Sequence, residues 1–489
     1  MNAALIFLIT AAIAGGLTIV VRRLAPQLNL TDRPDGHRKL HGHATPLGGG
    51  LAVMLATVTM VAILLILSNP WQEPLQAMSG QLVSLGLAAI VIVTVGLIDD
   101  RIQLRGRQKL LGQLLAIGIL IHGGLVIHSV ALFGYEIQLG ALALLFTGFW
   151  LLGAVNAMNL LDGIDGLASM LGLILVATIA GVAALTGRID MAILALIFAG
   201  ALAGFLPFNF PPATIFLGDA GSMLIGLLTG ALAIHGSLKG PGTLLLAAPL
   251  AIWTLPILDS AAALIRRRLT GRSVFATDRA HLHHRLMERL GTNRRVLALV
   301  ALCCLITSLG ALGSVAFQHD LIAALTGLSV VAMLAVSRFF GHTEFTLIRR
   351  RVRSTVHSLI SRGERSGQHP VAEALCLQGT RQWDHVWSAL VEPADKLGIT
   401  AIHLDLNLPM LQEAYNGSWQ RLTPPQSDRA WHVDVPLVLD GTAVGRLTLT
   451  GEKNGASLES TLDPLVTILD SIETELSTLL DRAEALTTN

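Results

Sequence analysis

The chain has 489 residues, of which 52% are hydrophobic and only 14% charged, with a formal net charge of +1. Soluble globular chains carry about 25% charged residues, so this deficit predicts that lipid is the solvent for much of the chain. The balanced charge provides no basic surface for nucleic acid, and we expect no nucleic-acid partner. Three cysteines, two of them adjacent at Cys303 and Cys304, give neither a disulfide framework nor a metal-binding spacing.

Eleven apolar segments are long enough to cross a bilayer, which takes about 20 residues. They cover residues 3–21, 47–67, 81–98, 110–128, 139–156, 166–186, 190–207, 221–238, 243–265, 296–316 and 319–338. The first segment is followed by no small-residue cleavage site, so we expect it to be an uncleaved span. The sequence therefore predicts an all-α polytopic membrane domain over residues 1–340.

The positive charges predict the orientation of these spans, because lysine and arginine concentrate in cytoplasmic loops. If the N-terminus lies outside, the inner loops contain eighteen Lys and Arg residues, and the outer loops contain only Arg188 and Lys239. The part of the chain after the last span is then cytoplasmic.

From about residue 341 the chain becomes more polar and contains no further span. Residues 382–391 have the pattern of a short amphipathic helix, and residues 400–406 that of a strand. Alternating apolar residues on both sides of Asp440-Gly441 predict a β-hairpin, and a last helix is expected over 458–482. Residues 341–489 are therefore expected to form a small cytoplasmic α+β domain. It loosely resembles a GAF or PAS sensor module, and its role is left open.

Five polar clusters interrupt the membrane part, and the distribution of positive charge places all of them on the cytoplasmic face. The first cluster covers residues 31–50 and ends in three consecutive glycines, which allow close backbone approach. A topology anchor explains Arg22 and Arg23, which precede this cluster. It does not explain the two carboxylates and three histidines that lie among the basic residues of the cluster.

Two further clusters carry carboxylates at the ends of apolar segments. Asp99 and Asp100 end one segment, where adjacent carboxylates are costly unless they bind a cation or act on a proton. Mg²⁺ prefers such oxygen ligands, and the alternative is a solvated helix end. Asp219 lies between glycines at the start of another segment. It could be only an N-cap, but beside the other acidic clusters it is a candidate metal ligand.

The cluster at residues 156–166 contains no Lys or Arg, so topology signalling cannot account for it. Asn159, Asp162 and Asp165 recur every three residues, which would place them on one face of a helical turn. The glycines at 163 and 166 make a loop equally compatible, and a purely structural turn is the plain alternative.

The fifth cluster contains His281, His283 and His284. Grouped histidines often bind transition metals, but five arginines crowd the same loop and favour an anion over a bare cation. We therefore expect the imidazoles to hydrogen-bond a diphosphate. Metal binding and a structural role are the alternatives.

In this order, the five clusters resemble those of the polyprenyl-phosphate N-acetylhexosamine-1-phosphate transferases. The matching segments are DRPDGHRKLH, GLIDD with KLLGQ after it, NAMNLLDGIDGLA, FLGDAGS and HLHHRL. The His-Leu-His-His form is similar to the WecA and TagO branch of the family. The resemblance implies a bacterial inner-membrane enzyme that transfers N-acetylglucosamine-1-phosphate from UDP-GlcNAc to undecaprenyl phosphate. It further implies that UMP is released, that Mg²⁺ is required, and that the product starts a lipid-linked glycan of the cell envelope.

The resemblance also implies roles for single residues. Asp219 is the best candidate for the Mg²⁺ ligand, with Asp99 and Asp100 at the metal and the acceptor phosphate. The three histidines would hold the diphosphate, and Phe216 could stack on uracil. The residues that match the nucleotide pocket are Lys109, Asn159, Asp162, Asp165, Asn209 and Phe216.

Several alternatives remain open from the sequence. The lipid phosphate could attack directly, or a phospho-aspartate could form on Asp99 or Asp100. A transporter of an anionic solute would place its binding residues near the bilayer midplane, whereas these carboxylates lie at span ends. An inactive scaffold with a sensing tail would not need the acidic clusters. The sequence leaves open which N-acetylhexosamine is used, which polymer follows, and whether the protein forms a homodimer.

Overall fold

The computed structural model describes residues 2–32, 44–236, 238–240, 243–269, 281–340, 345, 348–349, 371–378, 383–392, 394, 399–408, 413–421, 430–439 and 442–452. The chain forms two compact units. The first contains Met1–Leu264 and His281–His342, and the second contains Ile265–Ala280 and Thr343–Asn489.

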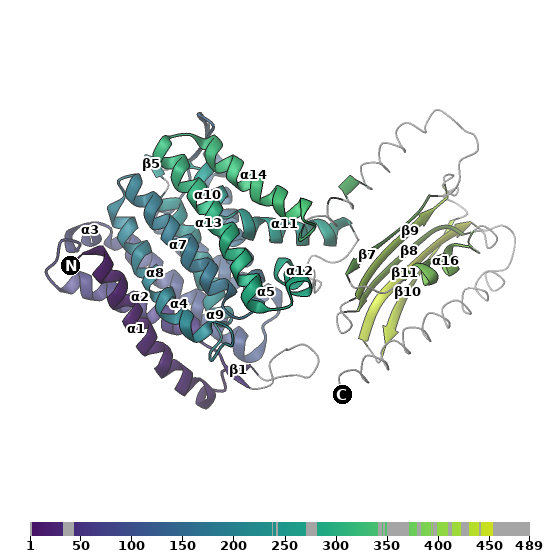
Figure 1. Cartoon of the computed structure of the whole chain (residues 1–489), viewed down its shortest axis with the longest axis horizontal. Helices are drawn as coiled ribbons and strands as arrows, with labels where there is room; N and C mark the ends of the chain where they lie inside the picture. The colour runs from purple at the N-terminus through teal and green to yellow at the C-terminus, as the bar shows by residue number, and fades with distance from the viewer. Residues whose placement is uncertain are drawn as a thin grey trace. The chain divides into compact units, whose positions relative to one another are not determined.

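The first unit is a bundle of helices that pack side by side (Figure 1). The described helices from the N-terminus to residue 336 are α1 (Ala3–Leu24), α2 (Gly49–Ile66), α3 (Gln72–Ala77), α4 (Ser79–Ile102), α5 (Gly106–His122), α6 (Ala143–Leu161), α7 (Leu167–Leu185), α8 (Ile189–Asn209), α9 (Gly218–Gly236), α10 (Ala247–Ile252), α11 (Thr254–Leu269), α12 (Leu282–Leu290), α13 (Asn293–Phe317) and α14 (Asp320–Val336). Within the described residues, eight helices are long and apolar enough to cross a membrane. This finding confirms the polytopic all-α class.

The expected spans agree with the structure to different degrees. The segments 110–128 and 319–338 correspond to the 17-residue helices α5 and α14. The segment 243–265 is not one continuous helix, because α10 ends at Ile252 and α11 begins at Thr254. Pro256 explains the break: it has no N–H to donate to the carbonyl of Ile252, and its ring would collide with that carbonyl.

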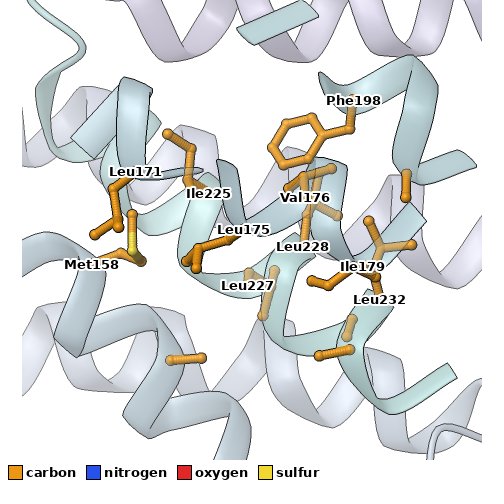
Figure 2. Close-up of a cluster of buried hydrophobic side chains, with 14 of the residues drawn as sticks. Met158, Leu171, Leu175, Val176, Ile179, Phe198, Ile225, Leu227, Leu228 and Leu232 are labelled. Carbon is orange, nitrogen blue, oxygen red and sulfur yellow. The ribbon is translucent and has the colours of Figure 1, made fainter. Parts of the chain in front are cut away.

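Helix α9 is the centre of the bundle, since every residue from Ala220 to Gly236 is buried. Figure 2 shows Leu171, Leu175 and Ile179 of α7 packed against side chains of α9. The labelled residues of α9 are Ile225, Leu227, Leu228 and Leu232. Two short sheets accompany the helices. The strands β1 (Thr31–Asp32) and β2 (Thr45–Pro46) pair antiparallel, and a second sheet has the order β4-β3-β6-β5. Its strands are β3 (Ser129–Leu132), β4 (Tyr135–Gln138), β5 (Leu238–Gly240) and β6 (Thr243–Leu245).

The second unit contains an antiparallel sheet of the order β10-β11-β8-β9-β7. Its elements are β7 (Val371–Gln378), α16 (Asp384–Val391), β8 (Ile399–Leu408), β9 (Glu413–Gln420), β10 (Ala430–Leu439) and β11 (Thr442–Glu452). Trp383, Trp387, Tyr415 and Trp419 are buried in its core. The short helix, the strand at 400–406 and the hairpin around Asp440-Gly441 are confirmed. The predicted helix at 458–482 lies outside the described residues, and the likeness to a sensor module stays a prediction.

Candidate active site

The centre of the site is an ion-paired lysine at one end of the bundle. The Nζ atom of Lys109 donates to Oδ2 of Asp219 at 2.5 Å and lies 2.8 Å from Oδ2 of Asp99. The other Asp99 oxygen accepts the N–H of Leu104 at 2.6 Å. Asp99 is 8% exposed, so the alternative of a solvated helix end is wrong. The structure therefore brings two predicted metal ligands and one predicted nucleotide-binding residue into direct contact.

Asp100 has a different environment from its neighbour. Its Oδ1 accepts the backbone N–H of Asp219 at 2.8 Å, and its Oδ2 accepts that of Ala220 at 3.4 Å. The first amides of a helix have no partner within the helix, and Asp100 supplies acceptors for two of them in α9. Asp219 instead directs its carboxylate to side chains of other helices, so an N-cap role does not describe it.

Glycines allow α4 and α2 to approach the first turn of α9 this closely. A Cβ atom on Gly96 would collide with the backbone of Ala220, and one on Gly50 would collide with the backbone of Gly221. Gly96 lies one helical turn before Asp100. The glycine that opens the GLIDD segment therefore lets the carboxylates of α4 reach the amides of α9.

Asn159 of α6 completes the surroundings of Asp219. Its Nδ2 donates to Oδ1 of Asp219 at 2.6 Å and to Oγ of Ser222 at 2.9 Å. One helical turn deeper, the amides of Gln113 and Asn156 hydrogen-bond each other, with the Asn156 amide donating at 3.0 Å. This pair links α5 to α6 below Lys109 and Asn159, and it therefore positions both of them.

Asp162 and Asp165 lie in a loop, because α6 ends at Leu161 and α7 begins at Leu167. The loop alternative is therefore right for these two residues, whereas Asn159 is helical. Oδ2 of Asp165 accepts the N–H of Ala213 at 3.0 Å. This bond ties the loop to the 210–217 segment.

Asn209 stabilises the same 210–217 segment from the end of α8. It is 3% exposed, its Nδ2 donates to the carbonyl of Ile215 at 3.1 Å, and its Oδ1 accepts from Ser169 at 2.7 Å. Phe216, within the segment, packs against the apolar cluster of Ala25, Leu30 and Leu47. Asn209 and Asp165 thus hold the 210–217 segment in place. The side chain of Phe216, within that segment, is half-buried.

Asp162 lies in an electrostatically unfavourable place for a carboxylate. Burial raises its pKa well above the ordinary value, and the carboxylates of Asp219, Asp100 and Asp165 raise the pKa further. Lys109 pairs with Asp219 and also with Asp99. Within the part of the chain that the structure describes, the carboxylates at this end of the bundle thus outnumber the cation that pairs with them.

The histidine cluster is next to the Asp162 loop. His283 is 2% exposed, and a Cβ atom on Gly163 would collide with its ring. Its ring is parallel to that of His281 with centroids 6.0 Å apart, and the His284 ring lies 4.3 Å from it. Within the described part of the chain, neither ring nitrogen of His283 has a hydrogen-bond partner. Burial lowers the pKa of His283 well below its usual range, and the neighbouring histidines lower it further, so the ring is neutral.

Part of the first cluster lies outside the described residues, which omit 33–43. Its glycines are described. Gly49 and Gly50, in the first turn of α2, donate to the carbonyls of Phe216 and Leu217 at 3.0 and 3.1 Å. These bonds fasten the segment before Asp219 to α2.

The donor set fits Mg²⁺ by charge and by ligand chemistry. Among the described residues no three His, Cys, Asp or Glu side chains are already gathered as a metal site, and Lys109 lies between Asp99 and Asp219. Mg²⁺ usually binds through one or two carboxylates plus substrate phosphates, so three protein ligands are not required. Among the described residues the carboxylates around Asp219 outnumber the ammonium group of Lys109, and such an ion would neutralise part of their charge.

Together, fold and site define a polytopic membrane protein with an acidic polar site at one end of its helix bundle. The family model described as glycosyl transferase family 4 matches residues 82–237. That range contains all five carboxylates of the site, Lys109 and Asn159.

Known proteins are similar to this chain in sequence. The chain is 33% identical over 286 residues to the probable undecaprenyl-phosphate N-acetylglucosaminyl 1-phosphate transferase of Bacillus subtilis (strain 168), covering 58% of this chain and 76% of that protein. It is 36% identical over 364 residues to the decaprenyl-phosphate N-acetylglucosaminephosphotransferase of Mycobacterium tuberculosis (strain ATCC 25618 / H37Rv), covering 68% and 87%. It is 34% identical over 256 residues to the phospho-N-acetylmuramoyl-pentapeptide-transferase of Enterococcus hirae, covering 49% and 75%. The chain therefore belongs to the polyprenyl-phosphate N-acetylhexosamine-1-phosphate transferase family, in its WecA/TagO-like branch.

Sequence reasoning missed three polar residues that support the site. Gln113 lies one turn after Lys109, and Ser222 one turn after Asp219, at spacings that place each pair on one helix face. Those spacings could have revealed them. Asp259, in α11, gave no local signal, because its partners lie more than twenty residues away along the chain.

Proposed function

We propose that this protein transfers N-acetylglucosamine-1-phosphate from UDP-GlcNAc to undecaprenyl phosphate and releases UMP. The observation that carries the proposal is the Asp219 carboxylate, held by Lys109 and Asn159 beside Asp99 and Asp100. The names of the relatives from Bacillus and Mycobacterium support the sugar and the polyprenyl phosphate acceptor. The product would start a lipid-linked glycan of the cell envelope.

Asp219 and Asp99 are the residues that would hold Mg²⁺, since the Oδ2 atom of each lies beside Nζ of Lys109 and the two carboxylates are therefore close together. When bound there, the ion would neutralise diphosphate charge and stabilise the departing UMP. Asp100 is the third proposed ligand, and like Asp99 it would have to release a present partner, since both of its oxygens accept amides of α9.

The protein's own residues would bind and position two anions. Lys109 supplies a fixed ammonium group, and such preorganised charge stabilises the transition state of a phosphoryl transfer. The histidines next to Gly163 would donate to the diphosphate from the other side. We propose direct attack: an oxygen of the lipid phosphate forms a bond to the sugar-linked phosphorus, and the bond from that phosphorus to the UMP oxygen breaks.

The hydrogen bonds of Asp99 and Asp100 support direct attack over a phospho-aspartate. Each of the four oxygens of these two residues has a bonding partner in the structure. A nucleophilic carboxylate oxygen would first have to lose one of these partners. Incubation with donor labelled in the sugar-linked phosphate, without acceptor, should leave the protein unlabelled; a labelled protein band would refute direct attack.

The activity itself is tested with membranes that contain the full chain, radiolabelled UDP-GlcNAc, undecaprenyl phosphate and Mg²⁺. We expect labelled lipid and stoichiometric UMP. Activity should disappear in EDTA and return with added Mg²⁺. Absence of labelled lipid in complete reactions would refute the transferase, whereas unchanged turnover in EDTA would refute only the metal requirement.

We also propose that the protein lies in the bacterial inner membrane with this site facing the cytoplasm. The asymmetry of Lys and Arg between the two sets of loops supports this orientation. A cysteine accessibility scan with a membrane-impermeant reagent tests it. Homodimer formation stays a prediction, as does the cytoplasmic location of the second unit.

A further inference from the structure

A buried carboxylate outside the predicted site lies beside the histidine cluster. Asp259 of α11 is 0% exposed. Its Oδ1 accepts the backbone N–H of Leu282 at 2.7 Å, and its Oδ2 lies 3.1 Å from Nδ1 of His281. A buried charge is costly unless it is paired and hydrogen-bonded, and these two partners satisfy it.

The same carboxylate holds both the backbone of α12 and the ring that precedes it. Leu282 is the first residue of α12, and His281 is the N-cap residue, whose own side chain makes no capping bond. Asp259 therefore takes one of the unpaired amides at the helix start. The second bond, to Nδ1, fixes the rotation of the His281 ring.

The contact with Oδ2 of Asp259 also indicates which nitrogen of His281 carries a proton. A carboxylate only accepts hydrogen bonds, so Nδ1 must be the donor in its contact with Asp259. The nitrogen left for a ligand is Nε2. A phosphate oxygen of the donor also accepts, and Nε2 can bind it only while carrying a proton as well. A His281 ring that donates from both nitrogens would be an imidazolium, with Asp259 as its counter-ion.

We infer that Asp259 is a positioning residue that acts through His281, which it holds as an imidazolium whose Nε2–H donates to the diphosphate of the nucleotide sugar. The inference rests on the proposed function for the identity of that ligand. The parallel stacking of His281 on His283 places this donor in the row of rings that reaches Gly163. The ring of this row that lies against the Asp162 loop is His283, and His281 is stacked on it.

An Asp259→Asn variant separates the two tasks of the carboxylate. The Asn side chain keeps an oxygen for the N–H of Leu282, but its NH₂ group donates to Nδ1 and favours the neutral ring with hydrogen on Nε2. Helix α12 should keep its position, while the His281 ring loses its positive charge. Charge-assisted hydrogen bonds are roughly twice as strong as neutral ones, so we expect the Kd for UDP-GlcNAc to rise about tenfold.

The matched variant is His281→Asn, which keeps a donor for Asp259 but has no group at the Nε2 position. Binding of UDP-GlcNAc to the purified full chain is measured for both single variants and the double variant, together with kcat and the melting temperature. We expect both single variants to bind more weakly with little change in melting temperature. The double variant should bind no more weakly than His281→Asn alone.

Three results would overturn the inference. The first is Asp259→Asn binding UDP-GlcNAc as the unmodified chain does, and the second is additive losses in the double variant. The third is failure of the unmodified chain to bind UDP-GlcNAc. By contrast, a chain that binds UDP-GlcNAc but forms no labelled lipid would refute the proposed transfer reaction and leave the role of Asp259 in binding supported.

Discussion

The ammonium group of Lys109 lies between the carboxylates of Asp99 and Asp219, at 2.8 and 2.5 Å. Asp99 belongs to α4, Lys109 to α5 and Asp219 to α9, so one side chain connects three helices. The contact joins residues 110 positions apart in the sequence. The ion pairs of Lys109 stabilise this end of the bundle. They also lie where we propose that a phosphate and a cation bind.

Replacement of Lys109 by Met should impair both stability and activity. Removing one partner of a largely buried ion pair leaves unpaired carboxylates and costs about 3 kcal/mol. We expect a lower melting temperature and at least about a hundredfold loss of turnover. Lys109→Arg, which keeps the charge, should retain most of the stability. A Lys109→Met protein with unchanged melting temperature would show that the ion pair contributes little.

The Asp219→Asn variant should lose about a thousandfold in turnover and still insert in the membrane. The substitution keeps the shape of the side chain but removes the charge that faces Lys109 and the proposed Mg²⁺. The matched control is Asp190→Asn, since Asp190 also begins a helix and pairs with a basic residue, Arg188, at 3.6 Å. The control should stay within about twofold of the unmodified activity. Equal activities of the two variants would remove Asp219 from the site.

The raised pKa of Asp162 predicts how the stability of the fold depends on pH. The folded chain holds this proton to a higher pH than the unfolded chain does. Stability is therefore lost as the pH rises from the ordinary value of 3.8 toward the raised one, and the cost is complete above it. In the absence of divalent cations, Asp162→Asn should raise the melting temperature at neutral pH and have a smaller effect in acid. The measurement is thermal unfolding of both proteins in EDTA across that range. If the gain in melting temperature of Asp162→Asn did not grow with pH, the raised pKa of Asp162 would be contradicted.

The sequence was sufficient to predict most of the apolar helices and the carboxylates at their ends, for a physical reason. Long apolar segments have few alternatives in lipid, and a carboxylate at the end of such a segment is conspicuous. It could not show that Asp100 accepts the amides of α9 while Asp99 pairs with Lys109. That difference depends on how α4 is rotated against α9, which is set by contacts distant in sequence.

Other features depended on long-range geometry in the same way. Asn209 is a residue type that often binds ligands, yet the oxygen and the nitrogen of its side-chain amide both bind neighbouring protein groups. Asp259 has a partner 22 residues away along the chain and lies in a largely apolar stretch. The break before Thr254, however, had a local cause in Pro256, which the hydropathy pattern alone does not weigh.

The approach of α4 to α9 leads to a prediction with an internal control on one helix. Gly96→Ala places a methyl group against the backbone of Ala220, where no flexible side chain can move aside. Overpacking of this kind costs about 1–3 kcal/mol, and any shift of α4 also moves Asp99 and Asp100 away from α9. Gly86→Ala, on the same helix, meets no atom within 4 Å and should be neutral or stabilising by up to about 1 kcal/mol. Melting temperature and turnover are measured for both. We expect Gly96→Ala to lower both quantities and Gly86→Ala to lower neither, because only the first substitution separates the two helices that build the site.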